Sequence, residues 1–274
     1  VPALVEAGAC HVSMLQRSPS YVASVPSRDR VATRVRQVMP DAVAHRVVRA
    51  KNVALSTLGY QVLRRYPDAG RRLLRRRMEQ ALPAGYPVEL HFTPTYDPWD
   101  QRLCAAADGD LFTVLGDGRA SVVTASIDAF EGDGIRLAGG EHVPADVIVT
   151  ATGLQMEFGG GARVFIDGVE VDVSSGHVYK GLMLSDVPNL ASSFGYINAS
   201  WTLRADLTCE LVCRWLNHMR DTGTVQCTPR LRATDRSMPE RSWIDGFSAG
   251  YMRRAMHLFP KQGDREPWIN PQDY

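Results

Sequence analysis

One arginine in this sequence stands in a setting that is typical of chemistry. Arg102 lies within Trp-Asp-Gln-Arg-Leu-Cys, residues 99–104. A guanidinium framed by an indole, a carboxylate and apolar neighbours is expected to be a buried cation, which must be paired or face a charged ligand. A purely structural ion pair with Asp100 explains the spacing at least as well. Arg102 is therefore a candidate for stabilising an anion.

A second pair of candidate residues, Arg17 and Ser18, follows a segment that alternates like a β-strand, residues 10–15. Residues 1–8 before it are typical of the second half of a helix that ends at a glycine. In a doubly wound dinucleotide domain, the tip of the second strand meets the adenosine ribose, where Arg or Ser suits a 2′-phosphate. The pair therefore indicates NADP(H) rather than NAD, with a solvated loop arginine as the alternative.

The stretch Asp-Val-Ile-Val-Thr-Ala-Thr-Gly, residues 146–153, predicts the central element of the fold. Its β-branched run is typical of a buried strand, and Thr152 and Gly153 end it in a small-residue turn that lets backbone approach a ligand. An ordinary core strand is the alternative. A meander of short strands is expected to lead into it. Those strands are predicted at residues 111–115, 120–124, 127–130 and 135–137.

The second half of the chain predicts short strands followed by a capped helix. The helix is expected over residues 203–220, with Ser200 or Thr202 as its N-cap. Because a loop of Gly, Asn and Ser leads into it, its N-terminus suits an anion or a cofactor. The strands are predicted at residues 163–166, 169–173, 178–184 and 189–194, the first two joined as a hairpin by Asp167-Gly168.

The segment from about residue 27 to 90 predicts a helical insertion, because apolar residues recur there at helical spacing between prolines. A nucleic-acid patch is one interpretation of its arginine cluster. The near-neutral net charge and the lack of interleaved aromatic residues instead favour a solvated or salt-bridged helix face, and next a contact with another part of the protein. The cluster consists of Arg64, Arg65, Arg71, Arg72, Arg75, Arg76 and Arg77.

Composition indicates a globular protein of 274 residues, 45% hydrophobic and 22% charged. The net charge of +1 gives no global field that draws the chain to nucleic acid or membrane. The five cysteines form no CxxC pair and no metal-ligand spacing, which predicts buried or free thiols in a reducing cytoplasm and no metal site. No apolar run approaches the ~20 residues that span a bilayer, and the first residues are not a signal peptide. The predicted location is cytoplasmic.

Six motifs occur in an order that carries a family resemblance. They are Met14-Leu-Gln-Arg-Ser-Pro, His91-Phe-Thr-Pro-Thr-Tyr-Asp-Pro-Trp-Asp-Gln-Arg-Leu-Cys, Asp108-Gly-Asp-Leu-Phe, Ala145-Asp-Val-Ile-Val-Thr-Ala-Thr-Gly-Leu, Tyr179-Lys-Gly-Leu-Met-Leu-Ser and Gly195-Tyr-Ile-Asn-Ala-Ser-Trp-Thr-Leu. With them the chain resembles the class B flavoprotein monooxygenases, specifically Baeyer–Villiger monooxygenases of the ethionamide-activating branch. The resemblance covers nearly the whole chain.

The resemblance implies an α/β fold with two dinucleotide-binding domains, both incomplete in this chain. Residues 1–153 would be part of a Rossmann-like NADP-binding domain with the helical insertion at about 27–90. Residues 154–274 would be the C-terminal part of the FAD-binding domain. The family uses FAD, NADPH and O2, forms a C4a-peroxyflavin, and converts a ketone into an ester or lactone. Ketones and thiocarbonyl or sulfide compounds are thus the implied small-molecule substrates, without nucleic acid.

The resemblance also implies roles for individual residues. Arg17 and Ser18 would hold the 2′-phosphate of NADPH. Arg102 would be the catalytic arginine that stabilises the anionic peroxyflavin and then the tetrahedral adduct, although Gln101 stands where many relatives have a lysine. The remaining implied positions are Thr152 and Gly153 in the link between the domains, Tyr196, Asn198, Trp201 and Thr202 near the isoalloxazine, and Trp268 and Asn270 beside the nicotinamide.

No Gly-x-Gly-x-x-Gly motif occurs in the sequence, although the family carries one for FAD and one for NADPH. The family motif that ends in His-x-x-x-Trp is also absent. The chain is therefore expected to be a fragment that neither retains FAD nor turns over alone. The alternatives are an N- or S-oxygenating flavin monooxygenase, or a non-catalytic module that binds NADP or a partner. A flavin disulfide reductase is disfavoured because no redox CxxC occurs.

Overall fold

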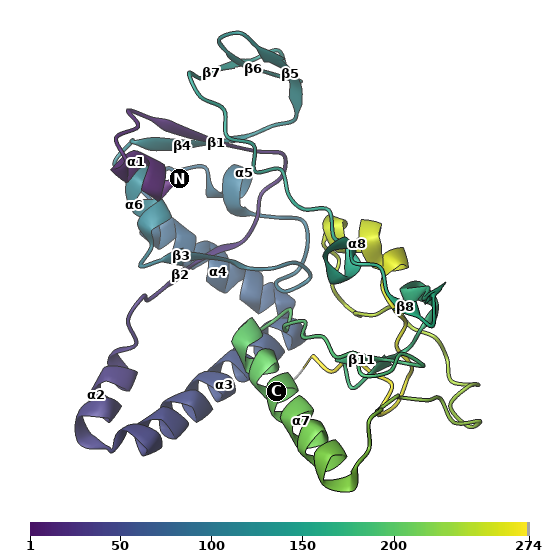
Figure 1. The fold of residues 1–274 in the computed structure, drawn as a ribbon. Coiled ribbons are helices and arrows are strands. Elements are labelled where there is room, and N and C mark those ends of the chain that lie inside the picture. Colours follow the sequence, from purple (N-terminus) through teal and green to yellow (C-terminus); the bar gives the residue numbers. More distant parts are fainter. Residues whose placement is uncertain (273–274) are drawn as a thin grey trace. The chain divides into compact units, whose positions relative to one another are not determined.

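The computed structural model describes residues 1–272. The chain divides into two compact units (Figure 1), of which unit 1 covers residues 1–152 and unit 2 begins at Gly153. Among the described residues, no helix has the length and apolar character needed to cross a membrane. All five cysteines carry free thiols, as expected, but four of them are exposed rather than buried.

Unit 1 contains two pairs of parallel strands. After helix α1 (Pro2–Glu6), strand β1 (Val12–Gln16) pairs with β4 (Ala120–Thr124). Strand β2 (Val22–Val25) pairs in the same way with β3 (Cys104–Ala107). Parallel neighbours cannot be joined by a tight turn, so each pair needs a long crossover. Parallel strands linked by helices give the unit its α/β character.

Four helices lie between β2 and β3. Because the Asp29 side chain accepts a hydrogen bond from the Ala32 amide, the first of these helices has a satisfied N-terminus. The third begins with a proline, which suits the first helical position. The helices are α2 (Arg30–Val38), α3 (Asp41–Arg65), α4 (Pro67–Ala81) and α5 (Val88–Phe92).

The core of unit 1 packs helices against the parallel strands. Helix α6 (Asp110–Gly116) covers β3 and β4, so the strand predicted at residues 111–115 is wrong. The chain turns at Gly109, which has φ 75°, and Phe112 and Leu115 then lie three residues apart on one buried helix face. Burial of that face in the core stabilises a helix here instead of the predicted strand. The rest of the core is formed by Val5, Tyr21, Val22, Leu74, Met78, Leu82, Val88, Phe92, Ala106, Val114, Ala120 and Val122.

A small antiparallel sheet follows in unit 1. It contains β5 (Ile127–Glu131), β6 (Gly134–Leu137) and β7 (His142–Pro144), which confirms the strands predicted at residues 127–130 and 135–137. Gly134 is required at its position, because a Cβ there would lie 2.2 Å from the carbonyl oxygen of Val143. The strands therefore approach each other closely at this turn.

The central strand predicted at residues 146–153 is not present. This segment has no regular structure, and Val147 and Val149 are 80% and 68% exposed. A β-branched run forms a strand only when a neighbouring strand completes its hydrogen bonds, and none of the described residues pairs with it. The predicted strand was wrong because a strand needs a neighbouring strand, and the β-propensity of its residues is not sufficient.

Unit 2 has little regular strand structure. Strands β8 (Phe165–Ile166) and β9 (Val169–Glu170) form the predicted hairpin in shortened form. The single strand predicted at residues 178–184 is instead a second hairpin, because the chain reverses at Lys180 and Gly181, both with positive φ. The strand predicted at 189–194 is irregular. The second hairpin consists of β10 (Val178–Tyr179) and β11 (Met183–Leu184).

Helix α7 (Trp201–Thr222) is the longest element of unit 2. The Ser200 side chain caps its N-terminus, and Gly223 ends it in the left-handed conformation, with φ 67°. Ser200, rather than Thr202, is thus the N-cap. The short helices are η1 (Phe158–Gly161), η2 (Val173–Ser175), α8 (Gly250–Ala255) and η3 (Met256–Leu258). One apolar core of the unit contains Val178, Ile197, Trp243, Ile244, Phe247, Ala249, Met252, Ala255 and Phe259.

Candidate functional site

The predicted NADP contacts lie at the carboxyl end of β1. Arg17 and Ser18 directly follow this strand, and both are exposed. Because β1 and β4 are parallel, their carboxyl ends meet at the same edge, which is where ligands bind in open α/β sheets. The structure therefore presents a guanidinium and a hydroxyl to solvent at this edge, and it leaves the predicted role untested.

A hydrogen-bonded cluster fixes the same edge. The Gln16 amide nitrogen donates to Thr124 Oγ1 (2.9 Å) and to the carbonyl oxygen of His91 (2.7 Å). His91 Nδ1 lies 2.8 Å from Thr124 Oγ1. Burial lowers the pKa of His91, which favours the neutral imidazole. The cluster ties α5 to the ends of β1 and β4. Gln16 and His91 belong to two of the six motifs, but the sequence does not indicate that they bond to Thr124, because the partners are 33 to 108 residues apart.

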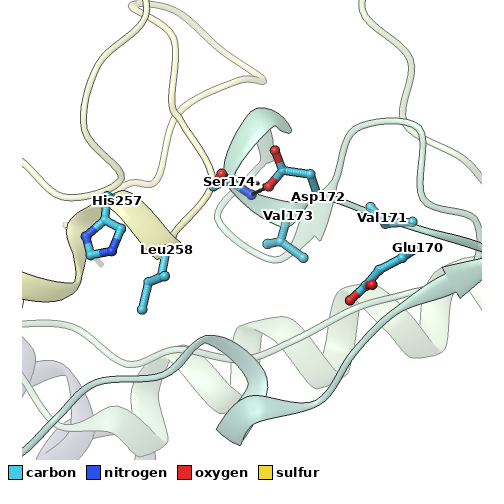
Figure 2. A pocket seen from close by; sticks show the side chains of 7 residues that line it. All are labelled: Glu170, Val171, Asp172, Val173, Ser174, His257 and Leu258. Carbon is cyan, nitrogen blue, oxygen red and sulfur yellow. Dashed lines mark hydrogen bonds between the residues drawn. The ribbon is translucent and has the colours of Figure 1, made fainter.

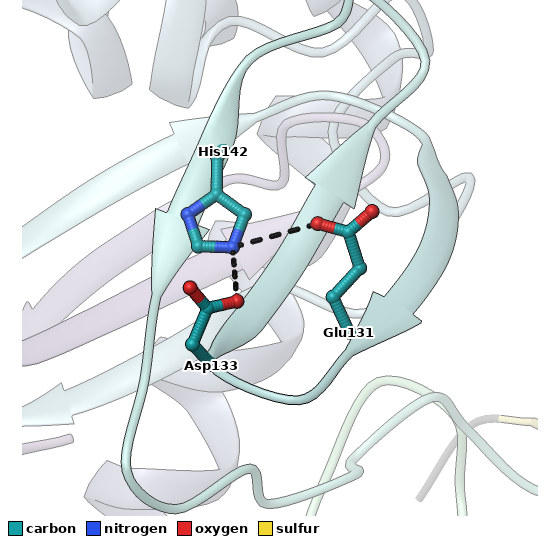
Figure 3. A group of neighbouring side chains, drawn as sticks. All are labelled: Glu131, Asp133 and His142. Carbon is teal, nitrogen blue, oxygen red and sulfur yellow. Dashed lines mark hydrogen bonds and ion pairs between the residues drawn. The ribbon is translucent and has the colours of Figure 1, made fainter.

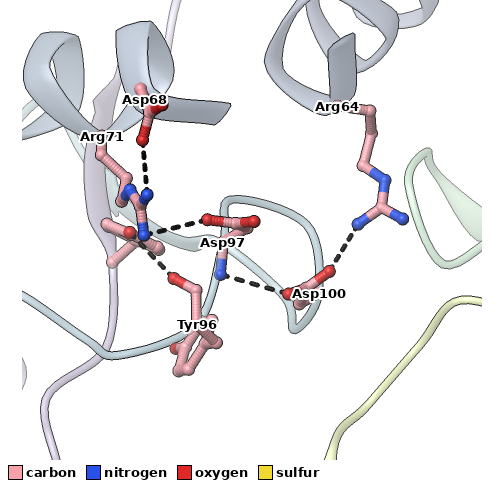
Figure 4. A network of polar contacts seen from close by, with 7 residues as sticks. Arg64, Asp68, Arg71, Tyr96, Asp97 and Asp100 are labelled. Atoms are coloured by element: carbon pink, nitrogen blue, oxygen red, sulfur yellow. Dashed lines mark hydrogen bonds and ion pairs between the residues drawn. The ribbon is translucent and has the colours of Figure 1, made fainter. Parts of the chain in front are cut away.

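Arg102 is exposed and lies just before β3, so the expectation of a buried cation was wrong. The carboxylate of Asp100 lies 2.5 Å from Arg64 Nη1 of α3 and accepts a hydrogen bond from the Asp97 amide (Figure 4). The buried polar atom of this segment is instead the indole nitrogen of Trp99. Arg102 is thus a surface residue that also has an interaction within the chain.

Trp99 has two unusual features beside Arg102. Its backbone is in the left-handed region, with φ 72°, which is strained for a bulky residue. Its buried indole N–H finds no acceptor among the described residues, although its ring contacts Tyr60 edge-on at 5.5 Å. An orphaned buried donor and backbone strain are typical of ligand-binding segments.

The arginine cluster of α3 and α4 is partly paired with acids. Arg71 contacts Asp68 at 2.5 Å and Asp97 at 3.1 Å (Figure 4), and both carboxylates raise its pKa. Arg75 contacts Glu79 and Glu89. The predicted salt-bridged face is therefore confirmed for these arginines and for the Arg64 pair described above. Its remaining members are exposed.

Thr152 and Gly153 stand at the division between the two units. Both are exposed and without regular structure. Gly153 has φ 112°, a conformation that favours glycine. Added side-chain atoms would meet nothing within 4 Å there, so the constraint is on the backbone and not on space.

The predicted flavin contacts of unit 2 surround the N-terminus of α7 but differ in exposure. Tyr196 is only 1% exposed, and Asn198 is half-buried. Trp201 and Thr202 are exposed in the first turn of the helix. The Trp201 ring packs against Gly195, where any side chain would overlap the indole. Trp201, Thr202 and Asn198 can thus reach a ligand, whereas Tyr196 shapes the loop from inside.

A buried arginine holds this loop. Arg204 is 5% exposed, and its guanidinium lies over the Tyr196 ring at 5.3 Å. It donates to the carbonyl oxygens of Pro271 and Lys180 and to Asn270 Oδ1, the last two at 3.3 and 3.2 Å. One side chain therefore connects α7, the β10–β11 turn and the C-terminal segment. The sequence analysis did not single out Arg204, because its partners come from segments that are distant along the chain.

Trp268 and Asn270 lie in the interior of unit 2. The Trp268 indole nitrogen donates to Asp235 Oδ2 at 3.1 Å. The Asn270 amide group donates to the carbonyl oxygen of Trp243 and accepts from Arg204. The polar groups of these two residues are thus used inside the unit, and their expected contact with nicotinamide stays a prediction.

A shallow depression of about 450 Å³ lies between β9 and η3 of unit 2 (Figure 2). Its polar members bind each other: Asp172 accepts from the Ser174 amide and hydroxyl, which lowers the pKa of Asp172. Glu170 pairs with Arg163. His257 is exposed at the rim. The residues that line the depression do not direct several hydrogen-bond donors toward one point. We therefore assign no function to it.

Three side chains that could ligate a cation meet on the small sheet of unit 1 (Figure 3). His142 Nε2 lies 3.1 Å from Asp133 Oδ1 and 3.7 Å from Glu131 Oε2. The ligand atoms lie within 4.8 Å of one another, and all three residues are classed as exposed. Arg136 Nη1 already pairs with Glu131 at 2.6 Å. The group therefore has the properties of a surface ion-pair cluster, which neither CxxC nor His spacing could indicate.

The fold of the chain is similar to a solved structure of OTEMO in a complex with FAD and NADP. The TM-score is 0.59, with 16% sequence identity, over 86% of this chain and 52% of the OTEMO chain. At this identity the likeness concerns the fold alone. It defines the class: a mixed α/β fold shared with a protein that binds two dinucleotides.

Sequence comparison finds relatives that are similar to the whole chain. The chain is 47% identical to the FAD-containing monooxygenase EthA of Mycolicibacterium smegmatis and 45% identical to EthA of Mycobacterium tuberculosis. It is 42% identical to the probable FAD-binding monooxygenase AlmA of Acinetobacter baylyi. Each match covers the whole chain and 54–55% of the relative. A scan against protein-family models gives no match.

The chain is similar along its whole length to relatives that are named FAD-containing monooxygenases, which confirms the resemblance drawn from its six motifs. It spans about half the length of the curated relatives that it matches. These relatives are named as monooxygenases that contain or bind FAD, and therefore as enzymes.

Proposed function

We propose that this chain contributes the NADPH contact and the catalytic arginine to a Baeyer–Villiger-type monooxygenase. The reaction would insert one oxygen atom of O2 into a ketone to give an ester or lactone, with thiocarbonyl and sulfide compounds as further substrates. The observation that carries the proposal is the exposed Arg102 beside the strained, unpaired Trp99, within a chain 47% identical to an FAD-containing monooxygenase.

The residues at the edge of β1 fit the 2′-phosphate of NADPH. Arg17 offers a planar, permanently charged fork of donors, and Ser18 offers a hydroxyl, which together suit a phosphate. Both follow a parallel strand at its carboxyl end and are exposed. The hydrogen bonds of Gln16 hold this strand end in place before the nucleotide arrives.

The residues of unit 2 fit the polar edge of a flavin. The N-terminus of α7 carries free amides and the positive end of the helix dipole. Asn198 and Thr202 add an amide and a hydroxyl there, and the loop is held by Arg204. When bound, FAD supplies oxygen activation and NADPH supplies the hydride.

Arg102 would act electrostatically. A guanidinium is a fixed cation, so it would stabilise negative charge on oxygen without taking part in proton transfer. The indole N–H of Trp99 would donate to an acceptor of the bound ligand, which relieves the cost of the unpaired donor. Gln101, in place of a lysine, leaves Arg102 as the cation of this motif.

The same proposal assigns each part of the chain to a cofactor-binding domain. Residues 1–153 would be part of the NADP-binding domain, with the helices of residues 27–90 inserted in it. Residues 154–274 would be part of the FAD-binding domain. The 274-residue chain by itself would not retain FAD, because it contains no Gly-x-Gly-x-x-Gly motif for the pyrophosphate.

A chimera tests the proposal. The chain is joined to the portion of the Mycolicibacterium smegmatis relative that it does not match, and the product is purified. We expect retained FAD, NADPH-dependent O2 uptake and conversion of a ketone to an ester that carries ¹⁸O from labelled O2. Arg102→Ala should lower kcat about 10²–10³-fold, the usual cost of losing one charge-stabilising group.

The matched control is Arg119→Ala, which removes an exposed arginine of unit 1 that pairs with Asp117. It should retain full activity. A flavin-loaded chimera that oxidises amines or sulfides but never ketones would decide for the N- or S-oxygenating alternative. Stoichiometric FAD on the 274-residue chain alone would refute its expected loss of the cofactor.

A further inference from the structure

Helices α2 and α3 expose a series of apolar side chains, which Lys51 interrupts between Val47 and Leu55 on α3. Figure 1 shows these helices extending away from the strands of unit 1. On α3, Leu55 and Leu58 are 61% and 58% exposed, and the spacing of the exposed apolar residues follows the turns of the helix. We call this set the apolar stripe. It consists of Val31 and Val38 on α2 and of Val43, Val47, Leu55, Leu58 and Val62 on α3.

The same helices carry a strong positive charge. Residues 30–81 contain 13 basic and 3 acidic residues, a net charge of +10, whereas the whole chain has a net charge of +1. The rest of the chain is therefore at −9. Although the net charge of the whole chain is near zero, positive charge is concentrated on α2, α3 and α4.

Several of these arginines are available to an external anion. Within residues 1–272 the following make no ion pair and are exposed: Arg34, Arg36, Arg46, Arg72, Arg76 and Arg77. Arg34 and Arg46 each lie three residues after a valine of the stripe, Val31 and Val43. Residues three apart are neighbours on a helix surface. Guanidinium groups thus border the apolar stripe on both helices.

We propose that the α2–α3 face docks on the surface of a membrane that contains anionic lipids. Exposed apolar side chains flanked by arginines are the pattern of a helix that lies in the interface plane. The valines and leucines would enter the boundary of the acyl chains. The long arginine side chains would extend to the headgroup phosphates. This inference does not rest on the proposed oxygenation chemistry.

Charge favours lipid over the other occupants of such a face. A second copy that used the same face would bring two regions of net charge +10 together, which costs free energy. Nucleic acid would pair with the arginines but would leave the aliphatic stripe in water, because phosphates and bases offer little to valine and leucine. An anionic bilayer satisfies both the charge and the apolar surface.

Vesicle co-sedimentation of the 274-residue chain tests this inference. The vesicles contain about 30 mol% phosphatidylglycerol in phosphatidylcholine, with pure phosphatidylcholine as the comparison. We expect the chain to sediment with the anionic vesicles, to sediment weakly with the neutral ones, and to be released at about 0.5 M salt, where charges are screened. Equal binding to both kinds of vesicle, or none to either, would overturn the proposal.

Two double variants separate the apolar and the charged contributions. Leu55→Gln/Leu58→Gln should lower partitioning at least about tenfold through lost apolar burial. The matched control is Leu207→Gln/Leu216→Gln, which replaces two exposed leucines of α7. Circular dichroism verifies that each variant is folded. Control and stripe variants that partition alike would contradict the assignment of the face.

Charge reversal gives the second pair of variants. Arg34→Glu/Arg46→Glu should lower partitioning at least about tenfold, since each basic residue near an anionic surface contributes about fivefold. Arg214→Glu/Arg220→Glu on α7 changes the net charge by the same amount and should bind as the parent does. Sedimentation velocity of the free chain is measured in parallel. If the parent chain is a dimer and the Leu55→Gln/Leu58→Gln variant is a monomer, the face binds a second copy of the chain and not a membrane. That result would overturn the proposal.

Discussion

The two units hold their candidate cofactor contacts by different physical means. In unit 1, Arg17 and Ser18 follow a strand that is fixed by a parallel ladder over five residue pairs. In unit 2, strands are only two residues long, and the Arg204 side chain packs on Tyr196 in the loop before α7. In a backbone ladder many hydrogen bonds each contribute part of the stability, whereas in unit 2 several hydrogen bonds depend on one guanidinium.

This difference predicts where single substitutions matter. The edge of β1 retains its ladder when one side chain of the Gln16 cluster is lost. The loop of unit 2 has no ladder. Arg204 joins α7 to Lys180, Asn270 and Pro271, and the Ile197 amide adds one hydrogen bond to Gln272. Gly181 adds to this dependence, since a Cβ there would lie 1.7 Å from the Arg204 guanidinium.

The largest effect is expected for Arg204→Ala. The substitution leaves three oxygen atoms without their shared donor and removes the support of the Tyr196 ring, so unit 2 should lose about 3 kcal/mol of stability. Urea unfolding followed by tryptophan fluorescence measures this, because four of the five tryptophans lie in unit 2.

Arg214→Ala is the control for this prediction, since Arg214 lies on the same helix and pairs only with Glu210 at the surface. Its cost should stay below about 0.5 kcal/mol. Equal unfolding midpoints for the two variants would show that the contrast between the units is false.

A middle-sized effect is expected for the pH dependence of unit 1. Burial lowers the pKa of His91 below its value in the unfolded chain, so the unfolded chain takes up the proton first as pH falls. The stabilising contribution is present above about pH 6.5 and is lost as pH falls through the folded pKa, by at most about 1.4 kcal/mol per pH unit. Urea melts at pH 7.5, 6.5 and 5.5, followed by circular dichroism, measure the slope.

His91→Gln should flatten that slope, whereas His45→Gln, at an exposed position of α3, should leave it unchanged. The ladder of β1 predicts that His91→Gln still folds at pH 7.5. Complete unfolding of this variant would mean that the side-chain cluster, and not the ladder, holds the edge.

The smallest effect is expected for Tyr21, whose hydroxyl donates to the carbonyl oxygen of Tyr96 at 3.0 Å. Burial raises its pKa to about 12. Because the folded pKa exceeds the unfolded value of about 10, its contribution is present below pH 10 and is lost as pH rises to 12. Tyr21→Phe should cost about 1 kcal/mol at pH 7.

An absorbance titration of the phenolates shows the same group directly. Burial raises the pKa of Tyr86 and Tyr96 as well, so the difference between Tyr21→Phe and the parent isolates one late-titrating phenol. Tyr66→Phe, at an exposed position, should leave the late phase intact. An unchanged late phase in Tyr21→Phe would contradict the assignment.

Local sequence signals predicted much of the fold. The hairpin at Asp167-Gly168 and the capped helix α7 formed as expected, because turn residues and caps act through contacts a few positions apart. The strand predicted at residues 146–153 and the one at 111–115 were wrong. Their β-branched and aromatic residues gave a propensity, but partner strands and burial decide which element forms.

For the candidate site, the sequence by itself determined the residue types and the motifs that carry the family: Arg17 and Ser18 after a strand, and Arg102 in its tryptophan-containing segment. Only the tertiary structure decided that Arg102 is exposed, that Trp99 keeps an unpaired donor and that Arg204 is buried among carbonyl oxygens. The physical reason is the separation along the chain of the residues that interact. Motifs, caps and turns act along the chain, whereas burial and hydrogen-bond partners depend on segments brought together from up to 108 residues apart.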